Sequence, residues 1–296
     1  MRSQRHGQCV NGKIFRNPMS ISRLRQNSVA QKLKKAFFLL GNRTPASRWY
    51  GAYKLTVLTK SLDQPFDPHH LPAGYGQWLD ERIVEYCWFF SRLPQDAGKL
   101  LDAGSTLNHE FIVSHPKLRD KDIIIMTLAP ETQCHWHKRI SYLYGDLRKT
   151  MFDANVFDYV VSISTLDHIG LNNQVFHRWR LQQDEQDADS YVVAVRELSR
   201  VLKPGGRCYI SVPYGKRVIA HGFQQVFDGA MIDRLIDEFK PASFISTYFQ
   251  YSQEKGWHLS DKSTASAARY FNYKMDVRWK GHPAAAEAVV CLELTK

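Results

Sequence analysis

The sequence predicts an α/β domain built on a doubly wound, mostly parallel sheet, and two observations support this prediction. First, short apolar runs alternate with segments of helical period from residue 99 onward, which is typical of parallel strands joined by crossover helices. Second, several of these runs end in glycine, serine or an acidic residue, as strands do where their carboxyl ends form a ligand site. A chain of 296 residues, 44% of them hydrophobic, can build one such domain and an extension.

Seven apolar runs are predicted strands. They cover residues 100–103, 123–128, 140–144, 159–163, 208–212, 244–249 and 289–294. Apolar residues at helical spacing predict helices over 79–90, 192–202 and 231–239. We therefore expect a seven-stranded domain over residues 99–296, preceded by a loop and a leading helix over 63–98.

Positive charge is concentrated at the start of the chain. Of the 40 Lys/Arg residues, thirteen lie in residues 1–62, which contain none of the 29 Asp/Glu residues. Residues 63–296 are close to neutral in net charge, so they do not predict a basic surface that would bind an extended nucleic acid. We expect residues 1–62 to form a basic N-terminal arm; Met19 is an alternative start.

One short amphipathic helix is predicted within this arm, over residues 29–40. Ser28 is a candidate N-cap. The apolar face comprises Val29, Leu33, Ala36, Phe37 and Leu40, with Lys32, Lys34 and Lys35 in the same stretch. Such a helix docks on the body, helps to form a dimer, or lies on an anionic membrane surface.

Several classes of protein are excluded. No run approaches the roughly 18–20 apolar residues of a membrane-spanning helix, and no segment resembles a signal peptide. The five cysteines are scattered and form no CxxC pair, which favours a reducing, cytoplasmic compartment over a disulfide framework. We expect no metal site, because Cys134-His135-Trp136-His137 lies in a predicted surface segment.

The most informative residues follow the ends of predicted strands. Asp102, Gly104 and Ser105 end the first run, and Asp146 and Leu147 follow the third. The fourth lies in FDYVVSISTLDHIG, where Ser164 precedes Asp167 and His168. Further along, RVLKPGGRCYISVP describes a helix that Pro-Gly-Gly ends and a strand that follows it.

These stretches resemble the class I S-adenosylmethionine-dependent methyltransferases, which have a Rossmann-like fold, over about two thirds of the chain. STLDHIG, SVPYGK and FQQVFD are similar to a methyltransferase type 11-like branch associated with polysaccharide and glycan biosynthesis. The resemblance implies that the run 289–294 is an antiparallel strand near the sheet edge. It also implies S-adenosylmethionine as the cofactor.

The resemblance places the cofactor over the strand ends. Gly104 would let the backbone approach the ligand, and the following helix N-terminus suits a carboxylate. The family pattern gives Asp102 a loop-shaping role and places Asp146 at the adenine amine, with Ser105, Leu147 and Ser164 in the same site. The alternative is that both acids cap turns or helices.

Two departures from the family pattern concern cofactor affinity. Ser105 and the three residues after it replace further glycines, and Thr127 stands where an acid usually binds the ribose hydroxyls. A hydrogen bond to a charged group contributes about 1.5–3 kcal/mol, so we expect binding about 10–100-fold weaker, in the micromolar range or above. Glu131 is a substitute if its loop bends back, and complete loss of binding is the alternative.

Methyl transfer to a hydroxyl needs a positioned acceptor and a base. His168 and Asp167 are the candidates, although His168 could instead bond a loop. Tyr214, His221 and Trp257 are expected in loops around the acceptor. The long segment 171–190 contains His177, Arg178 and Trp179, whose aromatic and polar side chains could bind a sugar acceptor. The acidic half of the segment is equally consistent with a solvated surface loop.

The predicted function is O-methylation of a sugar, a glycan precursor or another small molecule, with the arm at the membrane where such precursors are assembled. A dehydrogenase would need GxGxxG after the first strand, which is missing. A base-modifying nucleic-acid methyltransferase commonly has Asn/Asp-Pro-Pro-aromatic after the fourth strand, where this chain has Ser164 to Asp167. A catalytically degenerate relative that acts as a binding or scaffold module is the third alternative.

Overall fold

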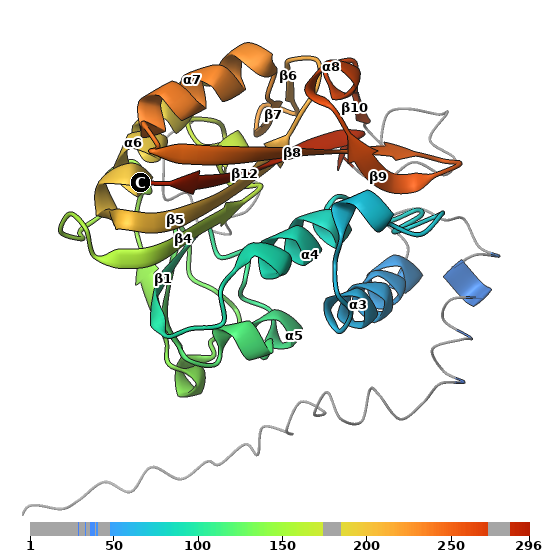
Figure 1. The fold of residues 1–296 in the computed structure, drawn as a ribbon, viewed down its shortest axis with the longest axis horizontal. Coiled ribbons are helices and arrows are strands. Elements are labelled where there is room, and N and C mark those ends of the chain that lie inside the picture. Colours follow the sequence, from blue (N-terminus) through green and yellow to red (C-terminus); the bar gives the residue numbers. More distant parts are fainter. Residues whose placement is uncertain are drawn as a thin grey trace, which may run out of the picture.

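The protein is built on one eight-stranded sheet with helices on both faces (Figure 1). This computed structural model describes residues 29, 33, 36–38, 40, 48–173, 185–271 and 285–296. The strand order is β3-β2-β1-β4-β5-β12-β8-β9. The strands are β1 (Gly98–Ala103), β2 (Lys121–Thr127), β3 (Ile140–Tyr144), β4 (Phe157–Ile163), β5 (Leu202–Pro213), β8 (Ser243–Ser252), β9 (Gly256–Ser260) and β12 (Ala288–Thr295).

The sheet is parallel from β3 to β5 and antiparallel beyond. All seven predicted strands are present, and β12 is antiparallel to both β5 and β8, which confirms the direction implied for the run 289–294. The predicted total of seven is wrong, because β9 pairs antiparallel with β8 and adds an eighth strand. Sequence reasoning missed β9 because it is short and contains only Trp257 and Leu259 as large apolar residues.

Four helices cover the two faces of the sheet. α4 (Arg82–Arg92) and α5 (Glu110–Val113) lie on one face, and α6 (Tyr191–Val201) and α7 (Gly229–Phe239) lie on the other (Figure 1). Two apolar cores result, one around Phe89 and one around Leu198. The helices predicted over 79–90, 192–202 and 231–239 are confirmed. The smaller elements are α8 (Lys262–Ala265), β6 (Val218–Ala220), β7 (Gln224–Val226), β10 (Tyr270–Phe271), β11 (Ala285–Ala286) and the 3₁₀ turns Pro68–His70, Pro116–Leu118, Trp136–Lys138 and Leu166–His168.

The predicted arm contains a second helix, α3 (Arg48–Leu62), which the sequence did not predict. A glycine and several β-branched residues give it a weak intrinsic preference for helix. Tertiary contacts stabilise it instead, because Tyr53 and Leu58 are buried and Lys54 binds Asp80 at 2.6 Å. The described positions among residues 29–40 are helical, as predicted, whereas residues 1–28 lie outside the described residues.

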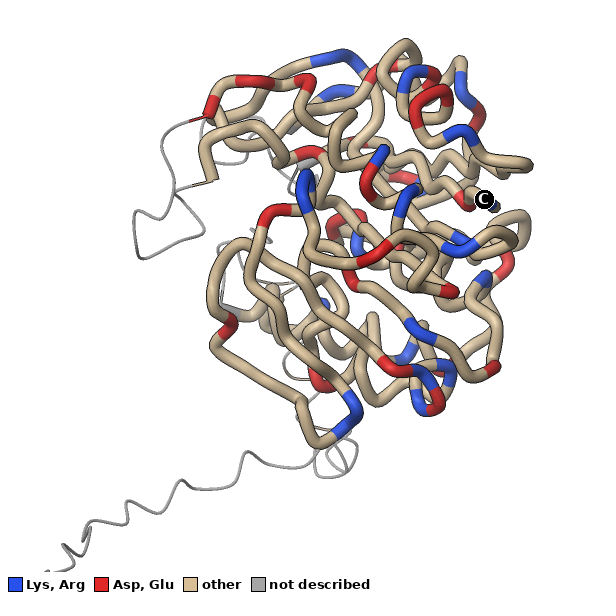
Figure 2. Tube along the Cα trace, turned by 90° about the vertical axis from the view of Figure 1, so that its left-hand side faces the viewer, with Lys and Arg blue, Asp and Glu red and all other residues tan. Residues whose placement is uncertain are grey.

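The surface of the described body carries mixed charge. Acidic and basic positions are interspersed along the chain trace (Figure 2). Within the described residues, no helix is both long and apolar enough to span a bilayer. The four described cysteines are free thiols, at positions 87, 134, 208 and 291.

Candidate functional site

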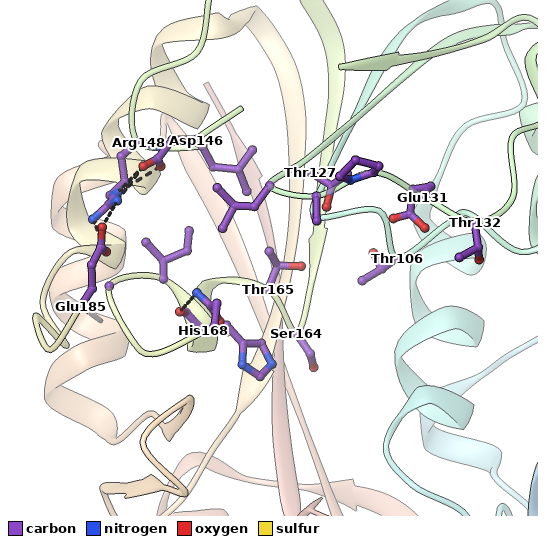
Figure 3. A pocket seen from close by; sticks show the side chains of 18 of the residues that line it. Thr106, Thr127, Glu131, Thr132, Asp146, Arg148, Ser164, Thr165, His168 and Glu185 are labelled. Carbon is purple, nitrogen blue, oxygen red and sulfur yellow. Dashed lines mark hydrogen bonds and ion pairs between the residues drawn. The ribbon is translucent and has the colours of Figure 1, made fainter. Parts of the chain in front are cut away.

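The carboxyl ends of β1, β2, β3 and β4 open onto one cavity of about 450 Å³ (Figure 3). Because β1 has β2 on one side and β4 on the other, the strand order reverses here, which is where open α/β sheets bind ligands. The lining combines the strand ends with the start of α4 and the chain before α6; it includes Arg82, Gly104, Thr106, Thr127, Glu131, Asp146, Leu147, Arg148, Ser164, Thr165, His168, Asn173 and Glu185.

Asp102 lies behind this lining and shapes the loop after β1. Its fully buried carboxylate accepts hydrogen bonds from the Leu107 N–H at 2.8 Å and from the Thr106 N–H at 3.2 Å and hydroxyl at 3.3 Å. Burial raises the pKa of Asp102 to about 7, and these hydrogen bonds act against the rise. Asp102 is therefore placed to hold the loop in shape, the role that the family resemblance implied.

Gly104 cannot carry a side chain here. Its φ is +125°, and an added Cβ would lie 2.1 Å from the Thr165 hydroxyl oxygen. The end of β1 thus packs directly on Thr165, two residues after the end of β4, which leaves bare backbone facing the cavity. Ser105 also has a positive φ, of 65°, but its hydroxyl is buried and does not line the cavity.

Thr127 ends β2 and lines the cavity, as predicted. Glu131 also lines it, so the loop after β2 does bend back, and Figure 3 shows Glu131 near Thr106 and Thr127. No hydrogen bond or ion pair joins the Glu131 carboxylate to another residue in the part of the chain that the structure describes. The Glu131 carboxylate is thus available in the cavity, four residues after Thr127, the position at which the family pattern expects an acid.

Asp146 follows β3 and lines the cavity, but its carboxylate is already engaged. Arg148 donates to both oxygens, with the shortest distance 2.6 Å, and also binds both oxygens of Glu185 at 2.8 Å. Burial disfavours the charged form, but the bonds from Arg148 outweigh it and hold the pKa of Asp146 below its ordinary value. An adenine amine at Asp146 would share the carboxylate with Arg148, while Leu147 supplies apolar surface beside it.

Two residues of α4 that the sequence analysis did not single out belong to this site. Arg82 lines the cavity and forms an ion pair with Glu85. Glu85 is fully buried, and its Oε1 accepts hydrogen bonds from Ser164 at 2.7 Å and Ser211 at 2.8 Å. A charged pair three residues apart within an otherwise apolar helix was the available signal, because buried charges need partners.

His168 lines the cavity, whereas Asp167 lies fully buried behind it. The His168 Nδ1 is 2.6 Å from the Phe223 carbonyl oxygen, so it is the nitrogen that carries the proton, and Nε2 lies 3.4 Å from Asp167 Oδ2. Burial raises the pKa of Asp167, and its Oδ2 accepts a hydrogen bond from Gln224 at 3.1 Å. Of the two predicted catalytic residues, only His168 can meet a ligand in the cavity.

Three residues expected around the acceptor lie elsewhere. Tyr214 and Trp257 are buried, and the Trp257 indole donates to the Leu79 carbonyl at 2.9 Å. His221 stacks on Phe223 and does not line the cavity. The expectation failed for the two aromatic residues because their size made core positions more favourable than loop positions.

The segment 171–190 is described only at its two ends, so His177, Arg178 and Trp179 lie outside the described residues. Two of its described acidic residues form ion pairs, Glu185 with Arg148 at 2.8 Å and Asp189 with Arg234 at 3.2 Å. Within the described ranges no group of three metal-ligating side chains is found.

Comparison with known families bears on the chemistry of this cavity. Residues 123–210 match the model of a methyltransferase domain. That stretch includes most of β2, all of β3, β4 and α6, and most of β5, and therefore most of the cavity lining. This match supports S-adenosylmethionine as the cofactor. A comparison with curated protein sequences found no match.

Several solved structures are similar to this chain at low sequence identity. The [4+2]-cyclase SpnF has a TM-score of 0.48 at 13% identity over 90% of this chain and 95% of its own. A 1,6-didemethyltoxoflavin-N1-methyltransferase of Burkholderia thailandensis has a TM-score of 0.42 at 11% identity over 95% and 93%. A SAM-dependent methyltransferase of Methanosarcina mazei has a TM-score of 0.41 at 11% identity over 70% and 96%.

The residues present fit S-adenosylmethionine. Bare backbone at Gly104 allows close approach to a ligand, and Glu131 supplies acceptors for a ribose diol in the same cavity. Thr127 and the Glu131 carboxylate line the same cavity.

Proposed function

We propose that this protein transfers a methyl group from S-adenosylmethionine to a hydroxyl of a small, sugar-like acceptor. The observation that carries the proposal is the Gly104 backbone, which faces a cavity at the reversal of strand order and lies against Thr165. Methyl transfer depends mainly on placing two reactants in line, and a cavity lined by four strand ends and α4 provides fixed walls for this. A scaffold protein would not need this open cavity, so we do not favour that alternative.

Each wall of the cavity would hold a different part of the cofactor. Gly104 and Thr106 would face the methionyl group, Thr127 and Glu131 the ribose, and Asp146 with Leu147 the adenine. Ser164 would face the reacting end, where the Glu85 carboxylate orients its hydroxyl. When bound, the cofactor supplies a methyl group on a positively charged sulfur.

His168 is the proposed base. Because its Nδ1–H is directed at the Phe223 carbonyl, the neutral ring has its basic lone pair on Nε2. That nitrogen would take the proton of the acceptor hydroxyl as the new carbon–oxygen bond forms. Asp167, 3.4 Å away, would hold the ring and stabilise its charged form, which makes it a positioning residue.

The lining favours a hydroxylated acceptor. Beyond the cofactor contacts, Thr132, His168 and Asn173 contribute polar groups, and the Asn173 Oδ1 is buried without a partner among the described residues. Hydroxyl groups can donate to and accept from such a surface. We extend the proposal to a sugar or glycan precursor handled in the cytoplasm.

Calorimetric titration with S-adenosylhomocysteine tests the cofactor assignment first. We expect one site per chain with micromolar affinity, and no heat from NADH. Transfer of radiolabel from S-adenosylmethionine to a panel of nucleotide sugars and lipid-linked saccharides then tests the acceptor class. Binding without transfer to any of them would reject the sugar assignment, and no binding would reject the enzyme itself.

A further inference from the structure

The loop after β2, which carries Glu131, is tied to its neighbours by one buried amide. The Asn108 side chain is 6% exposed and lies in the loop between β1 and α5. Its Nδ2 donates a hydrogen bond to the Gln133 carbonyl at 3.0 Å, two residues after Glu131. Its Oδ1 accepts a hydrogen bond from the Tyr142 hydroxyl of β3 at 2.8 Å. Asn108 therefore joins the loop after β2 both to the loop after β1 and to β3.

The Tyr142 hydroxyl is used twice in this arrangement. It donates to Asn108, and it accepts a hydrogen bond from the backbone N–H of His135 at 2.7 Å. The Asn108–Tyr142 pair thus holds the loop at the Gln133 carbonyl and at the His135 amide. A part-buried polar network in which each group has its partner fixes one conformation of the chain around it.

The stretch of this loop that contains Glu131 has no other hydrogen bonds. Within the part of the chain that the structure describes, residues 129–132 donate and accept none. Before them, Thr127 is paired in the sheet with Tyr144. After them, the Asn108–Tyr142 pair is the next anchor. The position of the Glu131 carboxylate in the cavity therefore depends on the end of β2 and on this pair.

We propose that Asn108 and Tyr142 are positioning residues for the cofactor ribose, because they hold Glu131 in the cavity beside Thr127. The inference rests on the proposed function, which assigns Glu131 to the ribose. Without the pair, the loop would sample conformations that direct the carboxylate into solvent. Cofactor binding would then include the cost of ordering the loop, and affinity would fall.

Tyr142→Phe tests the proposal, since it removes the shared hydroxyl and keeps the ring. Calorimetric titration of the full chain with S-adenosylhomocysteine should give a Kd raised about 3–10-fold, the range expected for one hydrogen bond. An analogue without the two ribose hydroxyls should bind both proteins equally. In the Glu131→Gln background, Tyr142→Phe should change Kd by less than about twofold, because the loop then has no charge to position.

Tyr159→Phe is the matched control. The Tyr159 hydroxyl donates to Asp96 at 2.7 Å, and neither residue lines the cavity. This variant also loses one hydroxyl hydrogen bond, yet it should bind S-adenosylhomocysteine like the unchanged chain. Asn108→Ala is a second variant, which removes both bonds of the amide and should raise Kd at least as much as Tyr142→Phe.

Hydrogen exchange of the ligand-free proteins gives a readout that does not need the cofactor. Amides in residues 128–135 should exchange faster in Tyr142→Phe than in the unchanged chain or in Tyr159→Phe. Unchanged exchange in this loop would overturn the proposal. An equal loss of affinity for S-adenosylhomocysteine and for the analogue would also overturn it, by showing that Tyr142 does not act through the ribose. Failure of the unchanged chain to bind S-adenosylhomocysteine, with faster loop exchange in the variant, would reject the proposed function and with it the ribose role.

Discussion

Replacing Glu131 by glutamine should weaken cofactor binding. The carboxylate lines the cavity beside Thr127 and has no partner among the described residues, so a ribose diol would be its first strong one. Changing a charged acceptor into a neutral one lowers each hydrogen bond by about 1–1.5 kcal/mol. For two ribose hydroxyls the expected loss of binding free energy is about 2–3 kcal/mol. Screening by solvent at this half-buried position reduces the loss to about 1–2 kcal/mol, which corresponds to about a 5–30-fold increase in Kd.

Calorimetry with S-adenosylhomocysteine measures this loss, and Glu254→Gln is the matched control because Glu254 is an exposed residue remote from the cavity lining. A dideoxyribose analogue sharpens the test. Removing both hydroxyls should cost affinity in the unchanged protein and little in Glu131→Gln, because the same bonds are lost either way. An equal loss in both proteins would show that Glu131 does not bind the ribose.

Thr127→Asp provides a second test of the same pair. It restores charged acceptors at the end of β2 and should tighten binding. The gain should be larger in the Glu131→Gln background, where the new carboxylate meets no neighbouring charge. If Thr127→Asp leaves affinity unchanged in both backgrounds and Gly104→Val also has no effect, the cofactor pocket lies elsewhere.

Gly104→Ala should lower the free energy of unfolding, measured by urea titration, by about 2–6 kcal/mol, which is the sum of backbone strain at positive φ and overpacking against Thr165. Gly205→Ala is the control, because Gly205 also has a positive φ, of +76°, but an added Cβ would have no atom within 4 Å. It should show the loss from strain alone. Equal losses would mean that Thr165 moves aside. His168→Ala should reduce turnover by about 100-fold or more with cofactor affinity retained, and Asp167→Asn by less; full turnover in both would leave positioning as the whole mechanism. Burial raises the pKa of Glu81 to about 8 in the folded protein, from an ordinary value of 4.5. Because folding then favours the protonated carboxyl group, the free energy of unfolding should fall as the pH rises from about 4.5 to 8. The total fall should be about 1.4 kcal/mol for each pH unit that separates the folded-state pKa from the unfolded-state pKa. Glu81→Gln should flatten that decline, and an unchanged stability profile would place the titration at another group.

The parts predicted from sequence are those that local chemistry decides. The strand–acid–glycine stretch at Asp102 and Gly104 needs only its own backbone geometry, and the structure places both as expected. Whether Glu131 lines the cavity could not be predicted from the sequence, because its position depends on the path of the loop after β2. Arg82 and Glu85 were missed because helical period assigns one buried face, whereas α4 is buried almost all round.

The β8–β9 hairpin also has a consequence for how the chain acquires its fold during synthesis. Gly74 and Tyr75 bond to Lys255 and Trp257 across about 180 residues, so the loop that leads into α4 is secured by a segment that leaves the ribosome about 180 residues later. Contacts of such long range form late, after the chain entropy of a large loop has been overcome. Since α4 supplies Arg82, a nascent chain that ends before β9 would have an incomplete cavity wall and exposed aromatic residues. Chaperone contact during translation should therefore persist until β9 has emerged.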